Sequence, residues 1–180
     1  MYGQEGDFMR QAACAVTGHR PSRFKFKYSE DQSLCKKIKR AMLEQFKRLY
    51  DEHGVRRYYV GGALGVDMWT GELILRLKEQ PGYGDIELVV VLPFEGHDSK
   101  WDERSKRRMD FLLRMCSDCV VIGKEDCREN YIKRNCYMVD HADYLVAVYD
   151  NERNLRSGTM QTVRYAQNKG ITISFFNPDT

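Results

Sequence analysis

The apolar run at residues 86–92, Ile-Glu-Leu-Val-Val-Val-Leu, restricts the folds open to this chain more than any other feature. A strand this uniformly apolar is buried on both faces, which happens mainly in parallel sheets covered by helices on both sides. Shorter apolar runs alternate with amphipathic segments, at residues 12–17, 57–60, 119–122, 144–149 and 171–175. This alternation predicts a Rossmann-like α/β fold, a three-layer α/β/α sandwich around a mostly parallel sheet of about six strands.

Length and composition indicate an ordinary globular protein. The chain has 180 residues, of which 42% are hydrophobic and 31% are charged, and this length is enough to bury a substantial core. No repeat, linker or low-complexity run divides it, so we expect one domain over residues 1–180 with its core at about 12–176. The formal net charge of +3 permits anionic ligands but is too small, unless clustered, to indicate nucleic-acid binding by itself.

No apolar stretch is as long as a membrane span, and residues 1–11 lack the apolar segment of a signal peptide. We therefore expect a cytoplasmic protein that does not bind membranes. Its six cysteines are then expected to be reduced thiols. Residues 116–119 form one Cys-x-x-Cys unit, whereas metal ribbons usually pair two, so we expect no metal site and no cofactor.

The longest amphipathic segment is predicted to be a helix that ends near His53. Ser29 is expected to cap it, with Gln32 completing a capping box, and Gly54 suits its C-terminus. Its apolar face is formed by positions spaced three and four residues apart, Leu34, Ile38, Met42, Phe46 and Leu49.

Two glycine-containing segments each lie between a predicted strand and a predicted helix. They are residues 61–67, Gly-Gly-Ala-Leu-Gly-Val-Asp, and residues 156–162, Arg-Ser-Gly-Thr-Met-Gln-Thr. A glycine turn at a helix N-terminus lets backbone N–H groups approach an anion such as phosphate. Either segment alone is more often a tight turn or a helix cap, but both together in one α/β domain favour a ligand site. The predicted ligand-binding residues are Gly61, Gly62, Gly65 and Asp67 in the first segment, and Arg156, Ser157, Gly158 and Thr159 in the second.

Three further predicted strands end in residues suited to ligand binding, and the carboxyl ends of parallel strands meet at one edge of a sheet. These residues are Gly18, His19 and Arg20 after the first strand, Pro93 and Phe94 after the third, and Tyr149 at the end of the fifth. Arg20 suits phosphate because its guanidinium group is always charged. Phe94 could stack on a base, or it could close the core together with Trp101.

Two carboxylates are candidates for catalysis, Asp67 and Glu95. Asp67 is predicted in the first turn of a helix, where the helix dipole stabilises a carboxylate. It could equally hold ribose hydroxyls or act as a base near a glycosidic carbon, and Glu95 could read a base edge or a ribose. Neither Gly-x-Gly-x-x-Gly nor Gly-Lys-Ser/Thr occurs in the sequence, which disfavours a dinucleotide fingerprint and a P-loop ATPase.

Three ordered blocks, residues 17–21 (Thr-Gly-His-Arg-Pro), 61–67 and 157–166, resemble the conserved blocks of the SLOG superfamily. That superfamily unites the DNA-processing protein DprA, also called Smf, with the LOG nucleotide phosphoribohydrolases. The block order and the compact length, with Pro93-Phe94 and Trp101 between the blocks, are most similar to its YpsA-like branch, the DUF1273 family. The resemblance covers roughly residues 12–176.

The resemblance implies a Rossmann-like sheet that binds a nucleotide or nucleotide derivative, with phosphate near the glycine segments. It also implies a homodimer. The LOG enzymes carry a Pro-Gly-Gly-x-Gly-Thr-x-x-Glu motif that supplies a catalytic glutamate. Here Val60 stands in place of the proline, the spacing differs, and Asp67 lies near the acidic position.

We therefore expect a cytoplasmic protein that binds a nucleotide or nucleotide derivative, as a metabolite sensor does. One alternative is an enzyme that hydrolyses the N-glycosidic bond of a nucleotide or ADP-ribose-like compound, with Asp67 and Glu95 as catalytic groups. A second alternative is single-stranded DNA binding of the DprA type, with Phe24, Phe26 and Trp101 stacking on bases. The basic track for this alternative is Lys25, Lys27, Lys100, Arg104, Lys106, Arg107 and Arg108.

Overall fold

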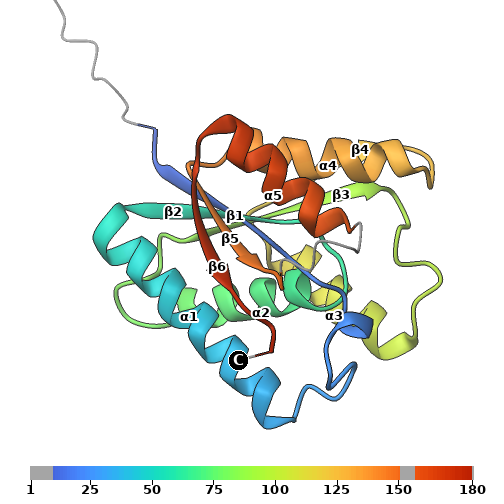
Figure 1. The fold of residues 1–180 in the computed structure, drawn as a ribbon, viewed down its shortest axis with the longest axis horizontal. Helices are drawn as coiled ribbons and strands as arrows, with labels where there is room; N and C mark the ends of the chain where they lie inside the picture. Colours follow the sequence, from blue (N-terminus) through green and yellow to red (C-terminus); the bar gives the residue numbers. More distant parts are fainter. Residues whose placement is uncertain (1–9, 151–156, 180) are drawn as a thin grey trace, which may run out of the picture.

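The computed structural model describes residues 10–150 and 157–179, and it contains a six-stranded parallel sheet between two layers of helices (Figure 1). In chain order the strands are β1 (Ala12–Gly18), β2 (Val55–Val60), β3 (Glu87–Phe94), β4 (Asp118–Gly123), β5 (Tyr144–Val148) and β6 (Thr172–Phe176). In the sheet they lie in the order β4-β3-β2-β1-β5-β6, and every neighbouring pair is parallel. The predicted Rossmann-like α/β/α fold is confirmed.

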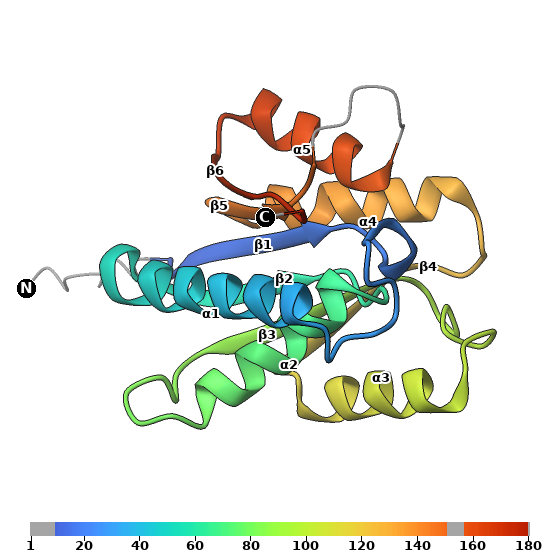
Figure 2. The same cartoon turned by 60° about the horizontal axis from the view of Figure 1, so that its bottom comes forward.

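The helices divide between the two faces of the sheet (Figure 2). One face is covered by α1 (Ser33–His53), α2 (Val66–Lys78) and α3 (Glu103–Met115), and the other by α4 (Arg128–Asp140) and α5 (Gly158–Lys169). Within the described residues, no helix is both long and apolar enough to cross a membrane.

The continuous apolar run of β3 follows from this layering. Leu88, Val90 and Leu92 belong to the core shared with α1, α2 and α3. Val89 and Val91 point the other way and belong to the core shared with α4 and α5. Because successive side chains of a strand alternate between faces, a strand buried on both sides needs apolar residues at every position.

The strand order reverses at β1, which places a crevice at the carboxyl ends of the strands. From β1 the chain steps outward through β2 and β3 to β4, and it then returns to β5 on the other side of β1. The helices α1 and α5, which come after β1 and β5 in the chain, therefore lie on opposite faces of the sheet, and ligands of open α/β sheets bind at such a point.

The N-terminus of α1 differs from the prediction. The helix begins at Ser33, its N-cap is Gln32, and the Gln32 side chain makes no capping hydrogen bond. Ser29 instead lies in a turn, where its N–H donates to the carbonyl of Phe26 at 2.9 Å. The C-terminus agrees with the prediction, since Gly54 adopts the left-handed conformation (φ 68°) that ends the helix.

Two phenylalanines anchor the segment before α1 to the hydrophobic core. The rings of Phe24 and Phe26 stack at 4.9 Å between centroids, and both pack against Trp69 of α2. Phe24 is 3% exposed and Phe26 is 9% exposed. The prediction that these two rings stack on nucleic-acid bases is therefore wrong, because they form part of the core.

Ion pairs of Glu30 and Arg108 join this segment to three helices. The Nη1 of Arg108, on α3, lies 2.8 Å from Glu30 Oε1, and its Nε lies 2.7 Å from Glu72 Oε1 of α2. Glu30 also accepts from Lys39 Nζ of α1 at 2.6 Å. Burial raises the pKa of Glu30, but the hydrogen bonds from Arg108 and Lys39 outweigh burial and lower the pKa from 4.5 to about 2.

Replacing Glu30 by glutamine is expected to lower the free energy of unfolding at pH 7 by about 2 kcal/mol, because Arg108 and Lys39 lose a partly buried ionic partner. The contribution of Glu30 is present above the pKa of the unfolded carboxyl, near 4.5, and is lost as the pH falls toward 2. Over this range the stability of the wild type should fall more steeply than that of Glu30→Gln, as measured by urea denaturation.

The matched control is Glu129→Gln, which removes an exposed carboxylate that pairs with Lys133 on α4. This change should leave the free energy of unfolding nearly unchanged, because solvent screens exposed pairs. If the two variants lost stability equally, the ion pairs around Arg108 would not hold the segment.

Candidate functional site

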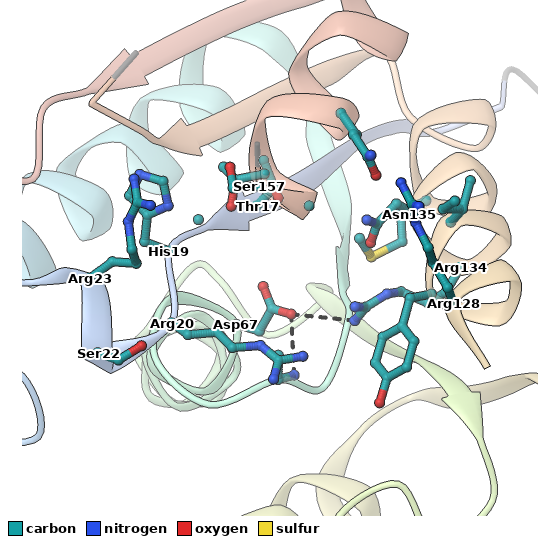
Figure 3. Close-up of a pocket in the computed structure, with 18 residues that line it drawn as sticks. Thr17, His19, Arg20, Ser22, Arg23, Asp67, Arg128, Arg134, Asn135 and Ser157 are labelled. Carbon is teal, nitrogen blue, oxygen red and sulfur yellow. Dashed lines mark hydrogen bonds and ion pairs between the residues drawn. The ribbon is translucent and has the colours of Figure 1, made fainter. Parts of the chain in front are cut away.

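A pocket of about 700 Å³ opens at the carboxyl ends of the strands, where β1 and β2 end and α4 and α5 begin (Figure 3). The end of β1 and the segment after it contribute Thr17, Gly18, His19, Arg20, Ser22 and Arg23. The segment after β2 contributes Ala63, and the first turn of α2 contributes Asp67. The other wall consists of Arg128, Tyr131, Ile132, Arg134, Asn135 and Met138 of α4, together with Ser157, Gly158, Thr159 and Gln161 at the start of α5.

The backbone conformation of residues 61–65 requires glycine at two positions. Gly62 (φ 67°) and Gly65 (φ 89°) adopt the left-handed region that disfavours other residues. A Cβ on Gly65 would also lie 2.8 Å from the carbonyl oxygen of His19. Gly61 lies directly against the guanidinium group of Arg134, so this segment packs closely against both β1 and α4.

Asp67 holds this segment from the first turn of α2. The side chain is buried, and its Oδ2 accepts from the N–H of Ala63 at 3.2 Å and lies 3.6 Å from Arg134 Nη1. Burial raises the pKa of the Asp67 carboxyl, while the charge of Arg134 and the Ala63 N–H oppose the rise. Asp67 therefore has a structural role in the 61–65 turn and also lines the pocket (Figure 3).

Arg134 is the buried cation of the site. It is 6% exposed, and its Nη1 donates to the carbonyl oxygen of Gly61. Its Nε has no hydrogen-bond partner among the described residues. Burial lowers the pKa of Arg134 and nearby Arg20 lowers it further, while Asp67 raises it. A negatively charged ligand beside the guanidinium group would supply a hydrogen-bond acceptor and a further compensating charge.

The pocket as a whole is cationic. Among the described residues that line it are four arginines, Arg20, Arg23, Arg128 and Arg134, and one carboxylate, Asp67. Arg23 is partly neutralised, because its Nη2 lies 3.4 Å from Asp150 Oδ2. The imbalance favours an anionic ligand, and guanidinium groups bind phosphate oxygens bidentately.

The N-terminus of α5 adds to this field. Ser157 is its N-cap, and the Ser157 Oγ accepts from the N–H of Met160 at 3.1 Å, so the hydroxyl serves the helix. Gly158 keeps the approach open, since a Cβ there would meet only Asn135 Nδ2, at 3.8 Å. The first amides of a helix have no partner within the helix and favour anions.

The structure brings many of the predicted site residues together. The large pocket is lined by Gly18, His19, Arg20, Asp67, Ser157, Gly158 and Thr159, and Gly61 and Pro93 line a smaller pocket beside it. Only the edge of His19 is available there, because the ring is 2% exposed and its Nε2 lies 3.1 Å from Asp150 Oδ1.

Other predicted residues lie elsewhere. Glu95 is exposed and lines neither pocket, and Phe94 and Tyr149 are buried behind the site. Gly62 also lines neither pocket but shapes the turn, as Gly65 does. Arg156 lies outside the described residues.

Sequence reasoning missed the contribution of α4. Arg128, Tyr131, Asn135 and Met138 recur at intervals of three and four residues, so they form one face of the helix. This spacing was visible in the sequence. Which face of α4 meets the strand ends was not, because it depends on how the helix packs on the sheet.

Comparison with known proteins places the chain in a family. The model of the YspA SLOG family (YpsA) matches residues 14–180. A UPF0398 protein of Staphylococcus epidermidis is 24% identical over 140 residues, which are 77% of this chain and 72% of the relative. A UPF0398 protein of Bacillus cereus is 28% identical over 141 residues, which are 77% of this chain and 74% of the relative. The resemblance to the YpsA-like branch of the SLOG superfamily is confirmed.

Solved structures share the fold. DNA processing protein A (DprA) of Streptococcus pneumoniae superposes with a TM-score of 0.60 at 16% identity, over 92% of this chain and 50% of that protein. DNA processing protein A of Helicobacter pylori, for which a single-stranded DNA binding mode is described, superposes with a TM-score of 0.57 at 16% identity, over 92% and 65% of the two chains. The chain thus spans between half and two thirds of the length of these two proteins.

Replacing Gly61 by alanine tests the packing of the 61–65 turn. The new Cβ would push the Arg134 guanidinium away from the Gly61 carbonyl and from Asp67, so the free energy of unfolding should fall by about 1–3 kcal/mol in urea denaturation. Gly84→Ala is the control, because a Cβ there meets nothing within 4 Å and stability should be retained. Equal stability of the two variants would show that the turn yields to the added methyl group.

Proposed function

This chain belongs to the YspA SLOG family, and we propose that it binds a nucleotide or nucleotide derivative through its phosphate groups in the pocket at the ends of β1 and β2. One observation carries the proposal: four arginines and the N-terminus of α5 surround this pocket, and Asp67 is the one carboxylate among its described lining residues. Such a cluster attracts anions because several positive charges face the same cleft.

The hydrogen-bonding groups of the pocket suit the sugar of such a ligand. Asp67 provides an acceptor for a ribose hydroxyl, and Thr17, Asn135 and Gln161 provide polar side chains along the wall. A protein that binds the ligand without consuming it would act in the cytoplasm as a sensor of a nucleotide metabolite. A homodimer remains a further part of this proposal.

Isothermal titration calorimetry of the purified protein against adenine, guanine, cytosine and uracil nucleotides should detect saturable binding of at least one of them. Arg20→Gln should weaken that binding about ten- to hundredfold, because a charge-assisted contact with phosphate is lost. Arg40→Gln is the matched control, since Arg40 is exposed on α1 and lines neither pocket. If no nucleotide binds, or if Arg20→Gln binds as the wild type does, the proposal fails.

Single-stranded DNA is a second candidate ligand, because the fold is similar to that of a DNA processing protein with a described single-stranded DNA binding mode. The described residues weaken this candidate. Phe24 and Phe26 are buried, and Arg108 is held by Glu30 and Glu72. Titration with a labelled oligonucleotide separates the two ligands: tight binding that falls steeply with salt, and that mononucleotides do not displace, would favour DNA.

Hydrolysis of an N-glycosidic bond is a third candidate, which the raised pKa of a carboxyl inside the pocket favours. Asp67 would take a proton from water as the water oxygen bonds to the anomeric carbon. The bond from that carbon to the base nitrogen would break, the electron pair would leave with the base, and the proton taken up by Asp67 would pass to the released base. If the protein releases base from a nucleotide, Asp67→Asn should reduce the rate at least about a hundredfold, as expected for loss of a general base.

Glu95→Gln is the companion variant in the same assay. Its carboxylate is exposed and lines neither pocket, so base release should continue at the wild-type rate. Unchanged release by Asp67→Asn, measured chromatographically, would remove Asp67 from the reaction.

A further inference from the structure

We propose that the ligand has two ends joined by an anionic centre: a flat ring lies in the smaller pocket, a polar substituent lies in the large pocket, and the anionic centre lies against Arg20 and Arg134. A nucleoside diphosphate that carries a further substituent on its terminal phosphate has this chemistry. The inference rests on the proposed function and specifies the class of ligand.

The smaller pocket, of about 200 Å³, has the character of a base-binding site. Four rings line it, those of Tyr28, His97, Trp101 and Tyr131, and its described lining includes no carboxylate. Stacking on aromatic side chains is a general way to hold a nucleobase. Phe94, which the sequence suggested for this role, instead packs edge-on against the rings of Tyr131 and His97.

His97 contributes a neutral ring. Its Nε2 lies 2.9 Å from the carbonyl oxygen of Gly62, and burial lowers the pKa of the imidazole. The ring is therefore uncharged near pH 7 and donates from Nε2 to that carbonyl. It also stands edge-on to Trp101, with 5.2 Å between ring centroids.

The two pockets adjoin. Five residues line both of them, and these are Arg20, Ser22, Ala63, Tyr131 and Arg134. A ligand in one pocket therefore contacts residues that also line the other, and the proposed ligand would extend across this shared wall.

The shared wall favours an anionic linker. Arg20 and Arg134 lie close enough that Arg20 lowers the pKa of Arg134, and Asp67 faces them both (Figure 3). Arg134 Nε has no hydrogen-bond partner within the described part of the chain. Two guanidinium groups with one carboxylate are matched better by the two linked phosphates of a diphosphate than by a neutral linker.

The large pocket then receives the remaining substituent. Its volume of about 700 Å³ exceeds what one phosphate group needs. The wall beyond Arg20 and Arg134 offers Arg128, Asn135 and Gln161 and the first amides of α5. Charged and amide groups suit a hydroxyl-rich or anionic substituent better than a second flat apolar ring.

The test uses three matched pairs of probes in calorimetric titrations: AMP with ADP-ribose, UMP with UDP-glucose, and GMP with GDP-mannose. In the pair that binds best, the extended member should bind at least about tenfold more tightly than the mononucleotide, since it makes an additional charge-assisted contact. Arg128→Gln should weaken binding of the extended member at least about fivefold more than binding of the mononucleotide, because the further substituent is proposed to lie against Arg128, with Arg40→Gln as the control.

The ring end is tested with Tyr28→Ala and Trp101→Ala. Each should weaken both members of the pair by the same factor, at least about fivefold, because stacking is lost for both. Tyr28 is 68% exposed, so its removal does not threaten the fold, and Phe111→Ala, at a ring 45% exposed on α3, is the control.

The outcomes separate this inference from the proposed function. Equal affinity for both members of the pair, or full affinity in both ring variants, would overturn the two-ended ligand while nucleotide binding itself stands. If none of the six probes binds the wild-type protein, both proposals fail together.

Discussion

The buried contact of Arg134 with Asp67 and the carbonyl of Gly61 is the interaction on which this structure depends. Arg134 belongs to α4 on one face of the sheet, and Asp67 belongs to α2 on the other face. At the carboxyl ends of the strands this contact joins the two helical layers through side chains. It also holds the 61–65 turn, which lines the smaller pocket, so the same contact stabilises the fold and shapes the binding surface.

Much of the fold could be read from the sequence, because the signals were local. The run from Leu88 to Leu92 identified a strand buried on both faces, and Gly54 marked the end of α1. The predicted start of α1 was wrong. Ser29 and Gln32 have the spacing of a capping box, but in the structure Ser29 lies in a turn next to the buried Phe26. A local sequence rule does not take into account a tertiary contact such as that of Phe26 with Trp69.

The site was predictable only where it lies at strand ends. Gly61, Asp67 and Ser157 follow or precede strands in an alternating pattern, so topology brings them together. Arg134 lies 67 residues beyond Asp67 in the chain, on a helix whose orientation no short motif reveals. The fold shared with the DNA processing proteins does not identify the ligand either. The sequences are only 16% identical, and proteins of one fold can bind different ligands and catalyse different reactions.

The segment from Arg20 to Tyr28 supplies side chains to both pockets, although it contains only one short 3₁₀ turn at Pro21–Arg23. Two anchors hold it, the rings of Phe24 and Phe26 against Trp69 and the carboxylate of Glu30 against Arg108. A loop fixed in this way has already lost most of its backbone freedom on folding. The entropic cost of association for its side chains is correspondingly small, which favours tight binding from a modest number of contacts.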